Sequence, residues 1–197
     1  MKIACLDMEG VLVPEIWINV AEKTGIDSLR LTTRDISDYD VLMKKRIEIL
    51  KEHDIGLKDI QSVIAEMGPL DGAADFIERL KKVFQVVILS DTFYEFAAPL
   101  IRQMGYPMIL CHQLIVDKKD CITGYTLRQK DSKQQAVKAF QGLNFKVVAT
   151  GDSYNDTTML SAADTGILFC PPENVIQEFP QFKVATTYDA LFDAMME

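Results

Sequence analysis

The sequence predicts an α/β fold: a doubly wound parallel sheet with a small helical cap inserted after the first strand. Two observations carry this prediction. Several apolar runs are rich in β-branched residues and show no period-two alternation, which is typical of strands that are covered on both faces of a parallel sheet. Helical patterns separate these runs, and strands that alternate with helices at this spacing form right-handed βαβ units.

Four runs have strand character, and each is short and bounded by polar residues. They cover residues 2–6, 85–90, 145–150 and 165–170. Patterns of helical period cover residues 72–82, 93–104, 132–142 and 153–163. In addition, a polar DKKD turn joins two apolar stretches within residues 114–125, and this predicts a short hairpin.

The segment 15–68 breaks the alternation because it contains helical patterns and no convincing strand. These patterns cover residues 15–24, 40–53 and 57–67. In an open α/β sheet, ligands bind outside the carboxyl ends of the strands, so an insertion directly after the first strand would cover the site. We therefore expect a core domain of residues 1–14 and 69–197, and a helical cap of residues 15–68.

Composition excludes one class of partner. The 197 residues include 21 Lys and Arg against 29 Asp and Glu, which gives a formal net charge of −8. Phosphate backbones are bound by clustered basic side chains, so nucleic acid is not expected to be the main partner. An anionic small-molecule ligand would need positive charge that is local to its site.

Cysteine usage and hydropathy indicate the compartment. The four cysteines are scattered and form no C-x-x-C pair, so neither zinc-site spacing nor a disulfide framework is expected. They are Cys5, Cys111, Cys121 and Cys170. No stretch approaches the ~18 apolar residues of a membrane span, and the apolar run before Asp7 is too short for a signal peptide. We expect a cytoplasmic protein without a membrane partner.

Polar side chains follow three of the four strand-like runs, at the edge where ligands bind. They are Asp7 with Glu9, Ser90 with Asp91, and Asp152 with Asn155 and Asp156. Carboxylates gathered at adjacent strand ends repel one another unless a hard cation such as Mg²⁺ takes their oxygens as ligands. The pattern thus predicts a divalent metal. Lys133, in the first turn of its helix, supplies a second positive charge where an anion is favoured.

Each of these residues also has a purely structural interpretation. Ser153 and Asp156 form a capping box, Asp91 and Asp131 suit helix N-caps, and Lys133 alone suits a solvated surface. For any one residue the structural interpretation is favoured, but the joint occurrence at successive strand ends favours a functional site. We expect Trp17 to pack in the core or the cap, and the two histidines, His53 and His112, fit no motif.

The polar positions resemble a known family. DMEGVLVPE at 7–15, ILSDT at 88–92, Lys133 and GDSYND at 151–156 look like the four ordered motifs of the haloacid dehalogenase superfamily of phosphotransferases. A small helical cap after the first motif is similar to the phosphoserine phosphatase branch. DMEGVLVPEIWI, YDVLMKKR and GDSYND most resemble the bifunctional members that also transfer the phosphoryl group from phosphoserine to homoserine.

The resemblance implies a covalent mechanism. Asp7 would be the nucleophile that forms an aspartyl-phosphate, which divides one difficult displacement into two easier ones. Glu9 would be the general acid for the departing serine and then the base for the acceptor, either water or homoserine. Mg²⁺ would be held by the Asp7 and Asp152 carboxylates and the Glu9 carbonyl oxygen. Asp156 would support the metal directly or through another group.

The remaining implied residues bind substrate. Four of them would hydrogen-bond the phosphoryl oxygens and offset the charge that develops there: Ser90, the Asp91 backbone, Lys133 and Asn155. Glu15 would bind the ammonium of an amino-acid phosphate, and Arg46 its carboxylate. Taken without the resemblance, Arg46 is one more charge on the solvated face of an amphipathic helix.

Two positions depart from the family pattern. Most members have Asp where this chain has Glu9, and Ser or Thr is common where this chain has Val11. Glutamate is longer than aspartate by one methylene, as homoserine is longer than serine. A link between these two facts is a hypothesis about acceptor choice.

Rival interpretations stay open at this point. One is a phosphatase of the same family for another small metabolite; a second is a phospho-accepting signalling module, although receiver domains are shorter and have no helical cap; a third is an inactive metabolite-binding scaffold. The sequence contains no G-x-x-x-x-G-K-[ST] and no G-x-G-x-x-G, which excludes other phosphoryl-transfer designs. The oligomeric state is open, a homodimer included.

Overall fold

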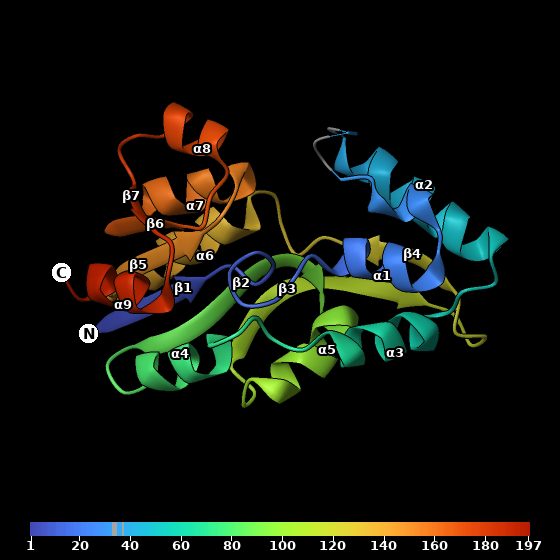
Figure 1. The fold of residues 1–197 in the computed structure, drawn as a ribbon, viewed down its shortest axis with the longest axis horizontal. Helices are drawn as coiled ribbons and strands as arrows, with labels where there is room; N and C mark the ends of the chain where they lie inside the picture. The colour runs from blue at the N-terminus through green and yellow to red at the C-terminus, as the bar shows by residue number, and fades with distance from the viewer. Residues whose placement is uncertain (33–34, 37) are drawn as a thin grey trace.

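The computed structural model describes residues 1–32, 35–36 and 38–197. Its centre is a seven-stranded sheet with the order β4-β3-β2-β1-β5-β6-β7 (Figure 1). All neighbouring strands are parallel except β3 and β4, which pair antiparallel at one edge. The strands are β1 Lys2–Leu6, β2 Gln85–Phe93, β3 Met108–Val116, β4 Ile122–Thr126, β5 Lys146–Gly151, β6 Thr165–Phe169 and β7 Lys183–Ala185. The predicted α/β fold with a parallel sheet is confirmed.

Helices cover both faces of the sheet and extend beyond one end of it. Those of the predicted insertion are α1 Ile16–Thr24, α2 Tyr39–Glu52 and α3 Leu57–Met67, with a short 3-10 helix η1 Asp27–Arg30. The others are α4 Ala73–Leu80, α5 Tyr94–Gln103, α6 Ser132–Gly142, η2 Tyr154–Asp156, α7 Thr157–Ala162, α8 Glu173–Glu178 and α9 Tyr188–Met196. None of the helices in the described part of the chain is long and apolar enough to cross a membrane.

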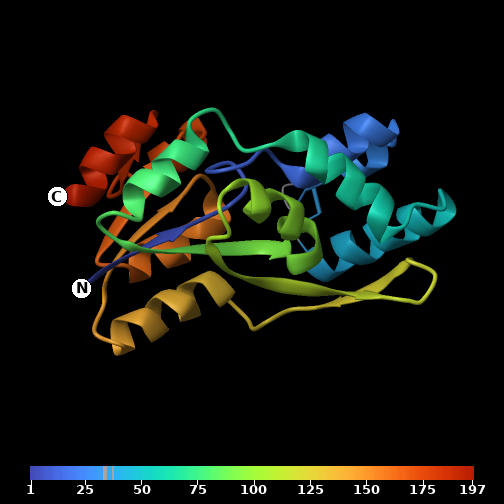
Figure 2. The ribbon, with the colours of Figure 1, turned by 90° about the horizontal axis from the view of Figure 1, so that it is seen from below.

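The central strand β1 is buried on both faces, as the lack of alternation in its apolar run predicts. On β1, Ile3 and Cys5 pack in a core cluster with residues of α6 and α7, whereas Ala4 and Leu6 pack in a second cluster with residues of α4 and α9. Figure 2 shows α6 on one side of the sheet and α4 and α9 on the other. A central strand with both faces covered needs apolar residues at every position.

Several elements differ from the sequence prediction. β2 continues past Ser90 to Phe93, with an irregular register between Leu89 and Phe93. The predicted hairpin is present, but its first strand begins at Met108, where it pairs parallel with β2 before it turns to pair with β4. The sequence analysis missed four short elements, namely η1, α8, β7 and α9.

The insertion is attached to the core by the β3–β4 hairpin. At its turn, the carbonyl and the carboxylate of Asp120 accept the backbone N–H groups of Leu57 and Lys58, both at 2.9 Å, at the start of α3. Tyr125 of β4 donates its hydroxyl to the Asp40 carboxylate of α2. The division into core and cap at residues 14 and 68 stays a prediction, and the hairpin lies in space with the cap.

Close packing of α7 on β6 gives a test of this architecture. A Cβ on Gly166 would lie 2.6 Å from the Leu160 carbonyl oxygen, whereas a Cβ on Gly142 would meet nothing within 4 Å. Since backbone atoms cannot move aside cheaply, we expect Gly166→Ala to lower the free energy of unfolding by about 1–3 kcal/mol. Gly142→Ala is the matched control and should leave stability unchanged or slightly higher. Urea unfolding of both variants measures this, and equal stabilities would contradict the packing described.

Candidate functional site

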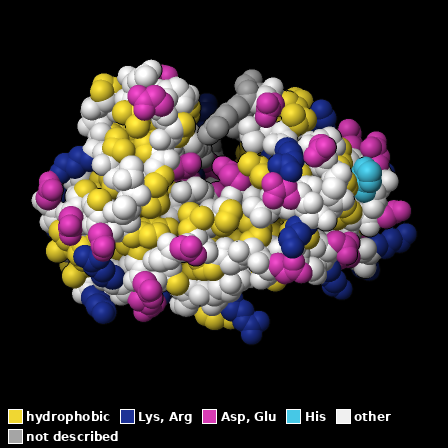
Figure 3. All heavy atoms as spheres, in the orientation of Figure 1, with side chains coloured by type: hydrophobic (Ala, Val, Ile, Leu, Met, Phe, Trp, Pro, Cys, Tyr) yellow, Lys and Arg dark blue, Asp and Glu magenta, His cyan; other side chains and the backbone are white. Residues whose placement is uncertain are grey.

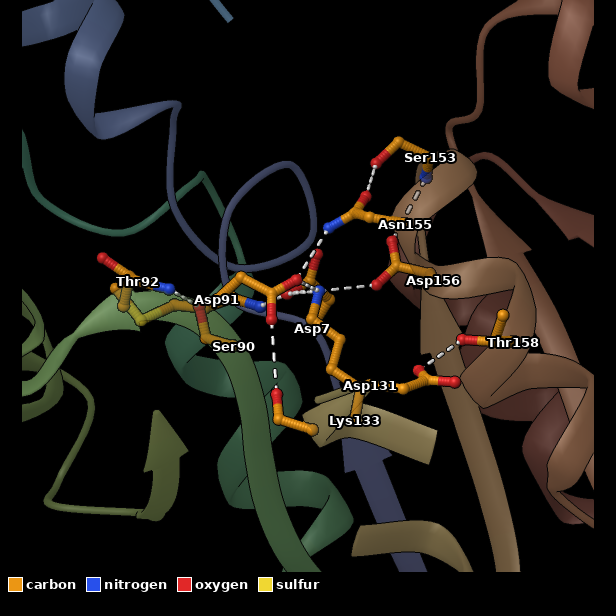
Figure 4. Close-up of polar contacts among 12 residues, drawn as sticks. Asp7, Ser90, Asp91, Thr92, Asp131, Lys133, Ser153, Asn155, Asp156 and Thr158 are labelled. Atoms are coloured by element: carbon orange, nitrogen blue, oxygen red, sulfur yellow. Dashed lines mark hydrogen bonds and ion pairs between the residues drawn. The ribbon is translucent and has the colours of Figure 1, made fainter. Parts of the chain in front are cut away.

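The site residues lie where β1, β2 and β5 end, below a notch in the surface. Figure 3 shows this notch between the half of the molecule that carries α7 and α8 and the half that carries α2, with acidic side chains inside it. Figure 4 shows the polar side chains that converge there from different strand ends. Asp7 follows β1 directly, and its backbone N–H donates to the Thr150 carbonyl of β5 at 2.9 Å. The structure thus brings the ends of β1 and β5 together.

The loop after β1 turns at Gly10 and passes close to the loop after β5. Gly10 has φ +77°, and a Cβ there would lie 2.4 Å from the Asp152 Oδ2 atom. A residue with a side chain would thus be strained in conformation and would also displace the Asp152 carboxylate. Glycine at this position is what allows the carboxylate of one loop to sit against the backbone of the other.

Lys133 is the central cation of the site. Its Nζ lies 2.8 Å from Asp7 Oδ1, 2.7 Å from Asp156 Oδ1 and 3.6 Å from Asp91 Oδ2. The Lys133 side chain is only 3% exposed. Burial alone would lower the pKa of Lys133, but the carboxylates of Asp156, Asp7 and Asp91 raise it well above its ordinary value. The lysine is therefore charged, and it is not the solvated residue that its position alone suggests.

Asp156 is held on both carboxylate oxygens. Its Oδ1 accepts from Lys133, and its Oδ2 accepts the backbone N–H groups of Asp152 and Ser153 at 3.0 and 3.2 Å. The side chain is fully buried. This arrangement fixes the lysine and the loop after β5 at the same time.

Three carboxylates of the site can approach a single ion. One oxygen each of Asp7, Asp152 and Asp156 lies within 4.8 Å of the others. Burial, followed by repulsion from Asp156, raises the pKa of Asp152 to about 6, and the same two causes raise that of Asp7 well above its ordinary value. An all-oxygen donor set with excess negative charge suits a hard divalent cation such as Mg²⁺. The residues present thus fit the metal that the sequence predicts.

The Asp91 carboxylate lies among four polar side chains. Its carboxylate lies 3.3 Å from both Ser132 Oγ and Asn155 Nδ2, and 3.6 Å from both Lys133 Nζ and His112 Nε2. Burial would raise the pKa of this carboxyl, but Lys133 and the donated hydrogen bonds hold it well below its usual range. Asn155 is oriented from both ends of its amide, because its Nδ2 donates to Asp91 and its Oδ1 accepts from the Ser153 hydroxyl.

A second group of predicted residues lies on the cap side. Glu9 Oε2 accepts the backbone N–H of Ile16, the first residue of α1, at 2.9 Å. Burial and the nearby Glu15 carboxylate raise the pKa of Glu9 to about 8. Arg46 is buried in α2 and interacts electrostatically with both acids. Glu15 also acts on Asp152, so the two groups adjoin.

Ser90, the last predicted residue, is buried at the end of the central part of β2. Its hydroxyl oxygen accepts the backbone N–H of Thr92 at 3.2 Å, and Figure 4 shows it next to Asp91. Every site residue proposed from the sequence is consequently found in one of the two adjoining groups or next to them.

The sequence analysis did not identify four residues that complete these groups. Ser132 and His112 contact Asp91 as described, and the Tyr39 hydroxyl donates to the Asp91 carbonyl at 3.4 Å. Trp17 stacks on Arg46, with its ring centroid 4.4 Å from the guanidinium carbon. Only Ser132, as the neighbour of Lys133, carried a signal in the sequence. His112 lies on β3, and its contact with Asp91 depends on the pairing of β3 with β2. The contacts of Tyr39 and Trp17 depend on how the insertion packs.

Comparisons with known proteins agree with this geometry. A family model of haloacid dehalogenase-like hydrolases matches residues 1–164. The chain is 64% identical over 191 residues to phosphoserine phosphatase ThrH of Pseudomonas aeruginosa, a match that covers 97% of this chain and 93% of the relative. It is 63% identical to a phosphoserine phosphatase of Pseudomonas syringae pv. tomato, a match that covers 97% of this chain and 81% of the relative.

Solved structures of similar fold include a substrate-bound phosphoserine phosphatase complex. That structure has a TM-score of 0.76 and 18% identity, and the match covers 94% of this chain and 93% of the other. A haloacid dehalogenase family hydrolase of Salmonella enterica serovar Typhi has a TM-score of 0.80 and 21% identity, with coverage of 100% and 71%. At these identities the structures show a shared fold.

The crowding of carboxylates predicts an unusual stability effect. The raised pKa of Asp152 means that its ionised form destabilises the metal-free folded state above about pH 6, and that this cost disappears as the pH falls and the carboxyl is protonated. We therefore expect Asp152→Asn to raise the free energy of unfolding by about 1–3 kcal/mol at pH 7.5. Urea unfolding in EDTA measures it, with a repeat at pH 4.5, where the gain should shrink. A variant less stable than the wild type at pH 7.5 would refute the repulsion.

Proposed function

Because the chain belongs to the haloacid dehalogenase-like hydrolase family, we propose that it is a Mg²⁺-dependent phosphoserine phosphatase that works through an aspartyl-phosphate. We propose further that it passes the phosphoryl group to homoserine as well as to water. Both relatives above 60% identity bear the name phosphoserine phosphatase. The observation that carries the proposal is that Asp7 lies 2.8 Å from the Lys133 ammonium and can approach the same ion as the Asp152 carboxylate.

In the first step, a carboxylate oxygen of Asp7 attacks phosphorus and the bond from phosphorus to the serine oxygen breaks. Asp7 is oriented for this role, because its Oδ1 accepts from Lys133 Nζ and from the Met8 backbone N–H at 2.7 Å. Glu9 gives its proton to the departing serine oxygen. The products are serine and an aspartyl-phosphate.

In the second step, the Glu9 carboxylate takes a proton from the acceptor hydroxyl, whose oxygen attacks phosphorus and releases Asp7. Water as acceptor gives free phosphate, and homoserine gives phosphohomoserine. The contact of Glu9 with the Ile16 N–H joins this proton carrier to the first turn of α1, so the cap helix fixes where the proton is exchanged.

The phosphoryl group needs positive charge and hydrogen-bond donors. Bound Mg²⁺ would supply two positive charges against the phosphoryl oxygens, held by the Asp7 and Asp152 carboxylates and the Glu9 carbonyl. Ser90, the Asp91 backbone, Lys133 and Asn155 would donate to these oxygens. Since both oxygens of Asp156 already accept hydrogen bonds, we assign it a supporting position behind the metal ligands.

The cap would bind the amino-acid end of the substrate. Arg46 provides a planar guanidinium for the carboxylate and Glu15 an anion for the ammonium. The substrates are thus small phosphorylated amino acids, and we place the reaction in the cytoplasm, in keeping with the four free cysteines among the described residues.

The direct test is turnover of O-phospho-L-serine with MgCl₂, with and without L-homoserine, following free phosphate and phosphohomoserine. We expect both products, and neither with EDTA in place of MgCl₂. Asp7→Asn should lower turnover by about 10³-fold or more, because the amide is not a nucleophile. If no phosphate and no phosphohomoserine form, the proposal is rejected; phosphate alone would leave a plain phosphatase.

Acceptor choice should depend on the length of the Glu9 side chain. Aspartate at this position would not reach the Ile16 N–H, and the space left beside the phosphoryl group admits water. We expect Glu9→Asp to lower the ratio of phosphohomoserine to free phosphate by about threefold or more, since both proton transfer and water exclusion change. Product ratios at saturating homoserine measure this effect. An unchanged ratio would show that the length of the Glu9 side chain does not determine the choice of acceptor.

A further inference from the structure

The cap contains a buried arginine, Arg46, beside the candidate site. Arg46 is 6% exposed. One terminal nitrogen donates to the Leu31 carbonyl at 2.7 Å, and the other faces the Met43 sulfur, a weak acceptor, at 3.7 Å. Its Nε is buried and has no hydrogen-bond partner in the described part of the chain. Among the residues that the structure describes, no carboxylate forms an ion pair with this guanidinium.

A cation buried in this way is costly unless something compensates it. Burial lowers the pKa of Arg46 to about 10, although Tyr39, Glu9 and Glu15 act in the opposite direction. At neutral pH the guanidinium is still charged. Its surroundings therefore hold a cation in place while leaving hydrogen-bond donors without strong acceptors.

The guanidinium of Arg46 is held by Trp17, the only tryptophan of the chain. The indole ring lies under the guanidinium, 4.4 Å from Cζ to the ring centroid, which is the geometry of a cation–π contact. Trp17 is itself fixed by the edge of Phe96, at 5.4 Å and 74°. Phe96 in turn packs edge-on against Phe93, at the end of β2. The indole is thus anchored to the core next to the strand end that carries Ser90 and Asp91.

A cation–π contact holds a guanidinium without using its N–H groups as hydrogen-bond donors. A carboxylate is also planar and accepts two such N–H groups side by side. We propose that Trp17 is a positioning residue that holds Arg46 in the plane in which it meets the carboxylate of the substrate, an inference that rests on the proposed function. Trp17 would then determine substrate specificity without touching the reacting phosphoryl group.

The rival explanation is that Trp17 only fills space in the cap, as the sequence suggests. Loss of packing would weaken the fold and affect all substrates alike. Loss of a positioning contact affects only substrates that carry a carboxylate. O-phosphoethanolamine separates the two cases, because it keeps the phosphate and the ammonium of phosphoserine and lacks the carboxylate.

The experiment compares Trp17→Met with Trp17→Phe on both substrates. Both residues are smaller than tryptophan, but phenylalanine keeps a π face and methionine has none, so the comparison of the two variants isolates the π face. For Trp17→Met we expect KM for phosphoserine to rise about tenfold with kcat changed less than about twofold, since a desolvated cation–π contact has this strength. The kcat/KM of Trp17→Met for O-phosphoethanolamine should equal that of the wild type. For Trp17→Phe, we expect a KM for phosphoserine between those of the wild type and Trp17→Met.

Two further measurements keep the result interpretable. In an Arg46→Met background, Trp17→Met should have no additional effect on phosphoserine, because the group it positions is gone. In the wild-type protein with EDTA, L-serine should change the fluorescence of the single tryptophan and ethanolamine should not. An equal loss on both substrates, or additive effects in the double variant, would overturn the assignment of Trp17. A wild-type protein that does not prefer phosphoserine over O-phosphoethanolamine would instead overturn the proposed function.

Discussion

The site depends on one buried ammonium, that of Lys133, and the carboxylates around it. Lys133 lies at the start of α6, where the helix dipole disfavours a cation, and it is removed from water. Asp7 and Asp156 at 2.8 and 2.7 Å make that position tolerable, and the lysine in turn makes the carboxylates tolerable to each other. One cation does not balance them, however, because Asp91 and Asp152 bring the acids to four. The folded site therefore retains an excess of negative charge, and this is the physical reason that it suits a divalent metal.

The same constraint explains why the loops after the strands have their particular conformations. Asp156 accepts from Lys133 with one oxygen and from two backbone N–H groups of its own loop with the other. The loop after β5 is therefore held in place beside Lys133. The loop after β1 can approach it only because Gly10 has no side chain. These local arrangements bring one carboxylate oxygen of Asp7 and one of Asp152 within 4.8 Å of each other.

The fold was predictable where the signal was local. β1, β2, β5 and β6 are continuous apolar runs, and the polar residues at their ends could be found from the same pattern. β7 has three residues and α8 six, too few for a period to stand out, and the first half of β3 is defined by its pairing with β2. In the site, Asp7, Lys133 and Asp156 followed from strand ends and motif order. Tyr39 and Trp17 did not, because they reach the site only through the packing of the cap. His112 did not, because it reaches Asp91 through the pairing of β3 with β2.

The two ends of the proposed substrate meet different electrostatic conditions. At the phosphate end, the charge of Lys133 is already neutralised by carboxylates, so a phosphoryl anion gains little attraction there until a metal is bound. At the amino-acid end, Arg46 is a buried cation without an ion pair among the described residues, so a carboxylate gains attraction whether or not the metal is present. A net charge of −8 is therefore compatible with an anionic substrate. In the proposed function, the cap would supply selectivity through a cation that is already in place, and the core would supply reactivity through a metal ion that has to bind.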